Sequence, residues 1–222
     1  MNGRWTCWTW ILIAAAAAWA SPADFKVEPT GACDRPGTSA SVKASLQAEG
    51  LRVSDASGAL CELWLRKAIP VDASASAGSY SAMAPGTFAG VIAYTGKGGD
   101  FRGQGIKPGV YTMRYALLPA DGNHMGVSPT TDYFMLSPAE ADSDPNVAIE
   151  YEKLLDLSRK ASGTNHPGVI YLVAPAAPGK AGMRDLGDNH HALDAVTKGM
   201  KPGGGPEIDF PLAIVLVGKG EG

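Results

Sequence analysis

The histidines are the first candidates for chemistry, because every one of them lies in an Asn-His step or directly after one. His124 stands in GNHMG, His166 in GTNHPG, and His190 and His191 in GDNHH. Neutral imidazoles bind copper and zinc, and the thioether of Met125 adds a soft ligand suited to Cu(I). One hypothesis is therefore a copper-binding protein whose site is formed by His124, Met125, His166 and His190 or His191.

The same steps are also good turns. Asn tolerates the left-handed conformation and bonds its own backbone, and the proline after His166 favours an extended conformation for that residue. The compact spacings that pre-arrange metal ligands, such as His-x-x-x-His or His-Glu-x-x-His, do not occur. If His190 and His191 lie in a strand, they point to opposite faces and only one can be an inward ligand. The turns are the favoured interpretation and the copper site is the alternative.

The sequence carries no recognisable catalytic motif. It has no Gly-x-Ser-x-Gly elbow, and nothing brings together any two of its carboxylates, which include Asp100, Asp121, Asp132, Asp188 and Asp194. The glycine-rich stretch 96–109 leads into a strand rather than a helix, so it favours a connection over a phosphate site. The members of a Ser-His-Asp triad need not be close in sequence, and a hydrolase therefore stays as a third interpretation without an identifiable site.

Residues 1–20, MNGRWTCWTWILIAAAAAWA, have the pattern of a secretory signal peptide. One basic residue precedes an apolar run, and Ala18-Trp19-Ala20 forms a small-x-small cleavage site. We therefore expect a periplasmic or extracellular protein with no transmembrane segment in the mature chain, in which 21–222 form one domain. The formal charge of −3 argues against nucleic acid as a partner, which leaves an unknown protein or small-molecule ligand.

Cys33 and Cys61 are the only cysteines beyond residue 20. In an oxidising compartment an isolated pair more often forms a disulfide than two free thiols, and no Cys-x-x-Cys suggests redox chemistry. The sequence therefore predicts a structural disulfide between Cys33 and Cys61.

Alternation of apolar and polar residues dominates the chain and predicts a mainly β protein. In 60–67 the apolar face carries Cys61, Leu63 and Leu65, while Trp64 lies on the opposite face. We expect that Trp64 either stacks on a ligand from an exposed face or is buried by a covering helix or loop, with burial favoured. The expected strands are 41–50, 60–67, 87–96, 109–119, 132–138, 168–175, 189–197 and 211–218.

One segment, 145–162, has the pattern of a helix. Asp144 is the expected N-cap with Pro145 after it, Gly163 follows the end, and the inner stripe runs from Val147 through Leu154 to Ser158. One helix among eight strands and long Gly- and Pro-rich loops predicts an antiparallel β-sandwich, immunoglobulin-like or jelly-roll-like. Its expected function is non-catalytic, as a binding or structural module that works through the loops 96–109, 119–132 and 175–190.

Overall fold

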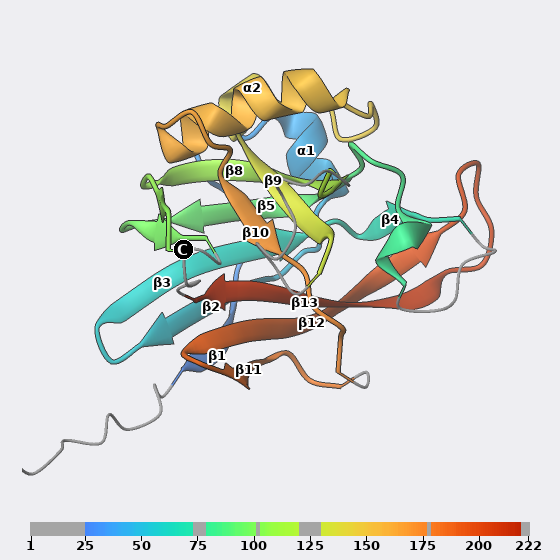
Figure 1. Ribbon diagram of the computed structural model, residues 1–222. Helices are drawn as coiled ribbons and strands as arrows, with labels where there is room; N and C mark the ends of the chain where they lie inside the picture. The colour runs from blue at the N-terminus through green and yellow to red at the C-terminus, as the bar shows by residue number, and fades with distance from the viewer. Residues whose placement is uncertain (1–24, 73–78, 101–102, 120–129, 177–178, 219–222) are drawn as a thin grey trace, which may run out of the picture.

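The protein is mainly β in a computed structural model that describes residues 25–72, 79–100, 103–119, 130–176 and 179–218 (Figure 1). The larger sheet has seven strands, each antiparallel to its neighbours, in the order β1-β2-β3-β5-β8-β9-β10. Their bounds are β1 Lys26–Thr30, β2 Gly50–Asp55, β3 Gly58–Leu65, β5 Phe88–Tyr94, β8 Gly109–Leu117, β9 Asp132–Pro138 and β10 Val169–Tyr171.

A second sheet contains β11 (Gly182–Gly187), β12 (His190–Met200) and β13 (Ile208–Val217), with β4 (Ala68–Pro70) parallel to β12. The very short strands β6 (Gly98–Gly99) and β7 (Gly105–Ile106) pair with each other. Two α-helices, α1 (Ala40–Ser45) and α2 (Tyr151–Ser162), and two single 3₁₀ turns, η1 (Tyr80–Ala82) and η2 (Ala139–Ala141), complete the described elements.

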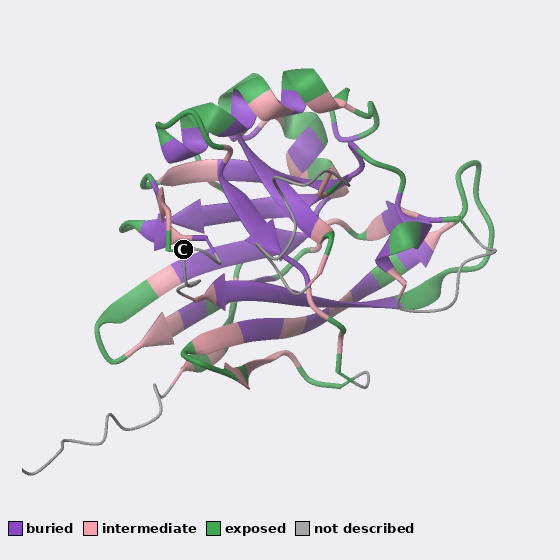
Figure 2. Ribbon diagram, viewed as in Figure 1, coloured by how far each residue is buried: buried purple, intermediate pink, exposed green. Residues whose placement is uncertain are grey.

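The two sheets share one hydrophobic core. Leu63 of β3 and Phe134 of β9 belong to the same buried cluster as Leu193 of β12 and Leu212 of β13. At one edge the sheets are joined, because the amide of Val173, just after β10, donates to the Ala213 carbonyl of β13 over 3.0 Å. Figure 2 shows buried residues concentrated in β5, β8, β9 and β13. Burial of this shared apolar surface is the main stabilising contribution in the fold.

Most of the predicted strands are confirmed, including the two faces of β3. Cys61, Leu63 and Leu65 face the shared core, whereas Trp64 packs in a separate cluster on the opposite face. β11 lies in a segment expected to be a loop, and its two end glycines and mixed polarity explain why no strand pattern is visible there. Its structure comes from pairing with β12.

The strand predicted at 41–50 is wrong, because residues Ala40–Ser45 form α1. The hydroxyl of Ser39 accepts the amide of Val42 over 3.1 Å, which is an N-cap bond. Val42 and Leu46 are buried on the outer face of the large sheet against Trp64. A helix turn and a strand both bring Val42 and Leu46 to one side, so alternation alone did not distinguish them.

The helix predicted at 145–162 begins later, at Tyr151. The reason is the guanidinium of Arg114, which donates to the carbonyls of Asp144 and Val147 over 2.7 and 2.6 Å. Arg66 likewise donates to the Pro145 carbonyl over 2.6 Å. These carbonyls are held by arginine side chains instead of helical amides. Val147, expected on the inner stripe, is 57% exposed.

The end of α2 is as predicted. Gly163 has a left-handed conformation (φ 73°, ψ 20°), and its amide donates to the Arg159 carbonyl over 2.8 Å. Leu154 and Ser158 are buried as expected, and Leu154 packs on the outer face of β9 with Met135. α2 therefore covers the outer face of the large sheet (Figure 1).

The predicted disulfide is wrong, because Cys33 and Cys61 are both free and both buried. Cys61 packs in the cluster that contains residues of both sheets, whereas Cys33 packs beside Trp64 on the other face of β3. The sheet itself separates the two sulfurs. Burial, and then the neighbouring charge of Glu62, raise the pKa of the Cys61 thiol to about 12.

In the part of the chain that the structure describes, no helix combines the length and the apolar character needed to cross a bilayer.

Candidate functional site

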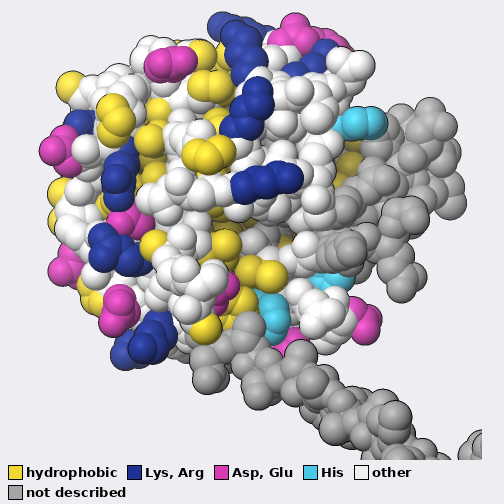
Figure 3. Space-filling view, turned by 90° about the vertical axis from the view of Figure 1, so that its left-hand side faces the viewer, with side chains coloured by type: hydrophobic (Ala, Val, Ile, Leu, Met, Phe, Trp, Pro, Cys, Tyr) yellow, Lys and Arg dark blue, Asp and Glu magenta, His cyan; other side chains and the backbone are white. Residues whose placement is uncertain are grey.

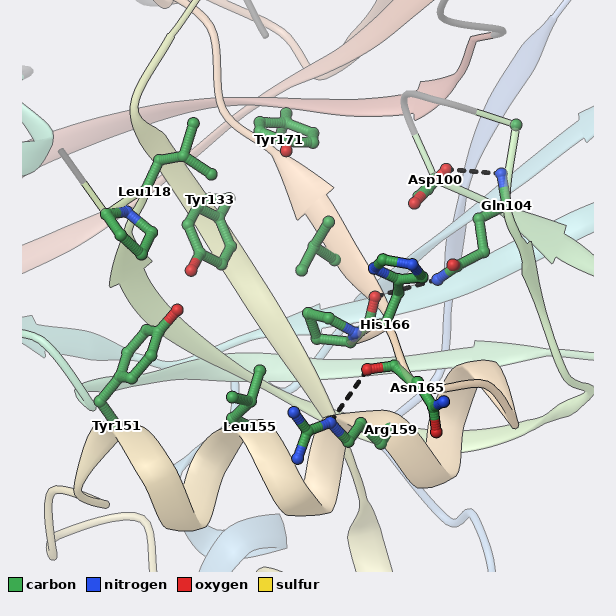
Figure 4. Close-up of a pocket in the computed structure, with 14 residues that line it drawn as sticks. Asp100, Gln104, Leu118, Tyr133, Tyr151, Leu155, Arg159, Asn165, His166 and Tyr171 are labelled. Carbon is green, nitrogen blue, oxygen red and sulfur yellow. Dashed lines mark hydrogen bonds between the residues drawn. The ribbon is translucent and has the colours of Figure 1, made fainter. Parts of the chain in front are cut away.

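A pocket of about 540 Å³ lies on the outer face of the large sheet, beside α2 (Figure 4). It is bounded by β9, β10, one face of α2, the loop 163–168 and the turn between β6 and β7. This volume is in the range of sites that hold small molecules. Its lining residues are Asp100, Gly103, Gln104, Leu118, Pro119, Tyr133, Tyr151, Leu155, Arg159, Asn165, His166, Pro167, Val169 and Tyr171.

Two tyrosines from neighbouring strands line the sheet side of the pocket. Tyr133 of β9 and Tyr171 of β10 are directly opposite each other in the antiparallel register. Cross-strand partners have side chains on the same face, so the two rings meet, with centroids 5.8 Å apart and a 47° tilt. Their strand neighbours Phe134 and Ile170 point the other way, into the shared core. Alternation thus assigns the tyrosines to the pocket face.

The helix contributes Tyr151, Leu155 and Arg159, which are spaced by four residues and therefore lie along one face of α2. Figure 4 shows the hydroxyls of Tyr151 and Tyr133 pointing toward one another. Burial, then the Tyr151 hydroxyl and the nearby Tyr171, raise the pKa of Tyr133 well above its ordinary value. Tyr133 therefore stays a neutral phenol, able to donate or accept a hydrogen bond.

The loop 163–168 brings Asn165 and His166 to the pocket and is held by hydrogen bonds at both ends. The hydroxyl of Ser162 donates to the His166 carbonyl over 2.5 Å, and that of Ser158 donates to the Gly168 carbonyl over 2.7 Å. The Nε of Arg159 donates to the Asn165 carbonyl over 3.0 Å. These bonds tie the loop to the last turn of α2, so its side chains are positioned by the helix.

The far corner of the pocket is formed by the turn between β6 and β7. The buried carboxylate of Asp100 accepts the amide of Gln104 over 2.7 Å, and the Gln104 side chain donates to the Pro167 carbonyl over 3.0 Å. These bonds link the glycine-rich segment 96–109 to the loop 163–168. Both segments were singled out in the sequence, and the structure places them side by side (Figure 4).

The predicted metal ligands are only partly described. His124 and Met125 lie outside the described residues, and so does Asp121. His166 is at the pocket, whereas His190 and His191 open β12, where the His191 ring packs on Phe25 with centroids 4.8 Å apart. Within the described residues, no three His, Cys, Asp or Glu side chains gather in a way that could hold a metal ion.

The turn interpretation is confirmed at one Asn-His step. Asp188 and Asn189, between β11 and β12, have φ values of 50° and 60°, which is the left-handed turn geometry of a tight hairpin. His190 and His191 follow as adjacent residues of a strand, as expected. Of the other carboxylates, Asp194 pairs with Arg184 over 2.7 Å, and Asp132 accepts the Tyr115 hydroxyl over 2.6 Å.

Trp64 is not available to a ligand, because only 2% of it is exposed. Its indole Nε1 donates to the Gly31 carbonyl over 2.8 Å, and α1 covers it through Val42. The ligand-facing interpretation of Trp64 is therefore wrong, and the alternative of burial by a helix is confirmed.

The expected working loops contribute unequally. The segment 96–109 lines the pocket through Asp100 and Gln104, and 119–132 contributes Pro119, but none of the described residues of 175–190 lines it. Sequence reasoning missed the aromatic residues altogether. The signal was present in the sequence: Tyr151 is on the predicted inner face of the helix, and the apolar strands before and after that helix contain Tyr133 and Tyr171.

No model of a known protein family, no curated protein and no solved structure matches this chain.

Proposed function

We propose that the protein is an exported, non-catalytic binding module that holds a small ring-containing molecule in the tyrosine-lined pocket. The finer architecture that we propose is a β-sandwich whose two layers are the large sheet and the β11–β13 sheet. The pocket carries this proposal, because it combines a suitable volume with three tyrosine rings and a few polar groups at its rim. The leader-like pattern of residues 1–20 supports the export, to the periplasm or outside the cell, that we propose.

Aromatic side chains suit this task for a physical reason. A tyrosine presents a rigid apolar ring for stacking on a sugar or an aromatic ring, with a hydroxyl that bonds polar substituents. Tyr133 and Tyr171 are held by the sheet, and Tyr151 by the helix, so little conformational entropy is lost when a ligand binds. The polar groups of Gln104 and Asn165 line the same space.

The test is binding of a library of small ring compounds to the full chain, followed by NMR. We expect shift changes concentrated at Tyr133, Tyr151 and Tyr171, and a loss of affinity of about fivefold in Tyr151→Ala, since a stacking ring contributes on the order of 1 kcal/mol. Glu152→Ala is the control, because Glu152 is the exposed neighbour in the same helical turn and does not line the pocket. Ring compounds that bind only elsewhere, or not at all, would refute the proposal.

A further inference from the structure

We infer that the ligand of this pocket is a ring that carries a carboxylate, and that Arg159 binds the carboxylate. This inference rests on the proposed binding function and adds the charge of the ligand to it. Three observations carry it: the free donors of Arg159, the cations around the mouth of the pocket, and the way in which the end of α2 is capped.

Arg159 reaches the pocket with donors to spare. Its Nε donates to the Asn165 carbonyl and its Nη1 to the Asp156 carboxylate over 2.8 Å, whereas Nη2 makes no hydrogen bond within the described part of the chain. The pair with Asp156 is exposed, so it contributes little and competes weakly with a ligand. A guanidinium that is fixed at Nε and open at Nη2 is well suited to a carboxylate.

Three lysines lie on or directly beside elements that bound this end of the pocket, and none of them has a carboxylate partner among the described residues. Lys97 lies against Gly105 and Lys107 against Gly163, while Lys160 follows Arg159 in the helix. A Cβ at Gly105 would lie 2.1 Å from the Cε of Lys97, and a Cβ at Gly163 would lie 2.3 Å from the Cε of Lys107. Each lysine side chain therefore lies directly against its glycine. Figure 3, which faces this end of α2, shows a row of Lys and Arg side chains down its upper part. In a chain with a net charge of −3, this cluster produces a local positive potential.

The C-terminal end of a helix ordinarily repels an anion, because its last carbonyls are unpaired. Here the carbonyls of Ser158, Arg159 and Ala161 accept the amides of Gly168, Gly163 and Lys107 over 3.1, 2.8 and 3.1 Å. Paired carbonyls and four nearby cations leave the rim by Arg159 favourable to an anion. The carboxylate among the lining residues is Asp100, across the pocket on the turn between β6 and β7. The ring would lie against the tyrosines, with its acid group at Arg159.

The experiment compares matched pairs by calorimetry on the full chain: glucuronate against glucose for a sugar ring, and 4-hydroxybenzoate against 4-hydroxybenzamide for an aromatic ring. We expect the acid of at least one pair to bind about tenfold or more tightly than its neutral partner, with an advantage that falls as salt is added. The pair that shows the effect identifies the kind of ring.

Three variants locate the effect. Arg159→Ala should abolish the advantage of the acid and leave binding of the neutral ring within about twofold, while Arg159→Lys should retain part of it. Lys153→Ala is the matched control, because Lys153 is an exposed cation of the same helix that neither lines the pocket nor belongs to the three lysines named above. Equal binding of acid and neutral ring at the tyrosines would overturn this inference and leave the proposed function standing. Absence of any ring binding at the pocket would overturn both.

Discussion

At the scale of single residues, the least replaceable side chain is Arg114, which is 1% exposed. All five of its N–H groups are used: Nε and Nη2 donate to the two oxygens of Asp142 over 2.7 and 2.6 Å, and the other three donate to the carbonyls of Gly86, Asp144 and Val147. The arginine therefore joins β8 to the segment that precedes α2. Its role is structural, because neighbouring oxygens accept hydrogen bonds from all of its N–H groups.

This arrangement predicts a large effect of Asp142→Asn. The amide keeps the shape but removes the charge that balances a buried guanidinium, so we expect a loss of about 3 kcal/mol in the free energy of unfolding, measured with urea. Arg114→Met should be worse still, because it leaves three carbonyls without their donor as well. Asp209→Asn, which breaks the exposed pair with Lys198, is the control and should leave stability unchanged within error. Equal effects of Asp142→Asn and Asp209→Asn would contradict this role of Arg114.

Sequence reasoning reached part of this picture. Alternation correctly predicted which residues of β3 share a face, because a strand imposes that pattern locally. It did not predict Arg114 as a buried residue, since its partner Asp142 is far along the chain and the bond depends on the path between them. The late start of α2 has the same origin: the local signals at Asp144 and Pro145 favour a helix, and distant arginines override them.

At the scale of elements, the end of α2 determines where the pocket loop begins. Gly163 turns the chain back with its positive φ, and the loop then returns to Ser158 through Gly168. The pocket thus depends on a helix terminus, which was correctly predicted, and on a cross-strand tyrosine pair, which was not. A single strand does not reveal its neighbours, so the register of β9 and β10 was invisible in the sequence.

We therefore predict that Gly163→Ala lowers the free energy of unfolding by about 1 kcal/mol, because an alanine is strained at a φ of 73°. Its Cβ would also lie 2.3 Å from the Cε of Lys107, a flexible atom that can move aside. The double variant Lys107→Ala/Gly163→Ala separates the two causes in urea denaturation. If it recovers the lost stability, the contact with lysine is the cause and backbone strain is not.

At the scale of the whole molecule, two of the three hydrophobic clusters among the described residues lie on opposite faces of β3. Cys61 belongs to the large cluster, which contains residues of both sheets, and Cys33 belongs to the smaller cluster beneath α1. The segment 31–46 that covers the smaller cluster is attached by the bond from Trp64 to the Gly31 carbonyl and by the ion pair of Arg35 with Glu62. The covering segment is small, so we expect it to open without unfolding of the sheets.

The two thiols report on these two clusters separately, in a Cys7→Ser background that leaves only Cys33 and Cys61. Labelling with a thiol reagent at mildly alkaline pH should modify Cys33 first, through local opening, with a rate that depends weakly on urea. Cys61 is 1% exposed, and its raised pKa keeps it a thiol, so its labelling should follow global unfolding and rise steeply with urea.

Variants of the two arginines that pair with Glu62 test whether the covering segment opens separately from the sheet. Arg35 and Arg52 both bind this carboxylate, but Arg35 belongs to the covering segment and Arg52 to β2 within the sheet. Arg35→Ala should therefore accelerate the labelling of Cys33 about fivefold and leave that of Cys61 unchanged, since loss of a partly buried ion pair weakens the attachment by on the order of 1 kcal/mol. Arg52→Ala should not change the labelling of Cys33 in this way. Two results would show that one cluster holds both cysteines. The first is an equal labelling rate of the two thiols at every urea concentration, and the second is their oxidation to an intramolecular disulfide in the folded protein.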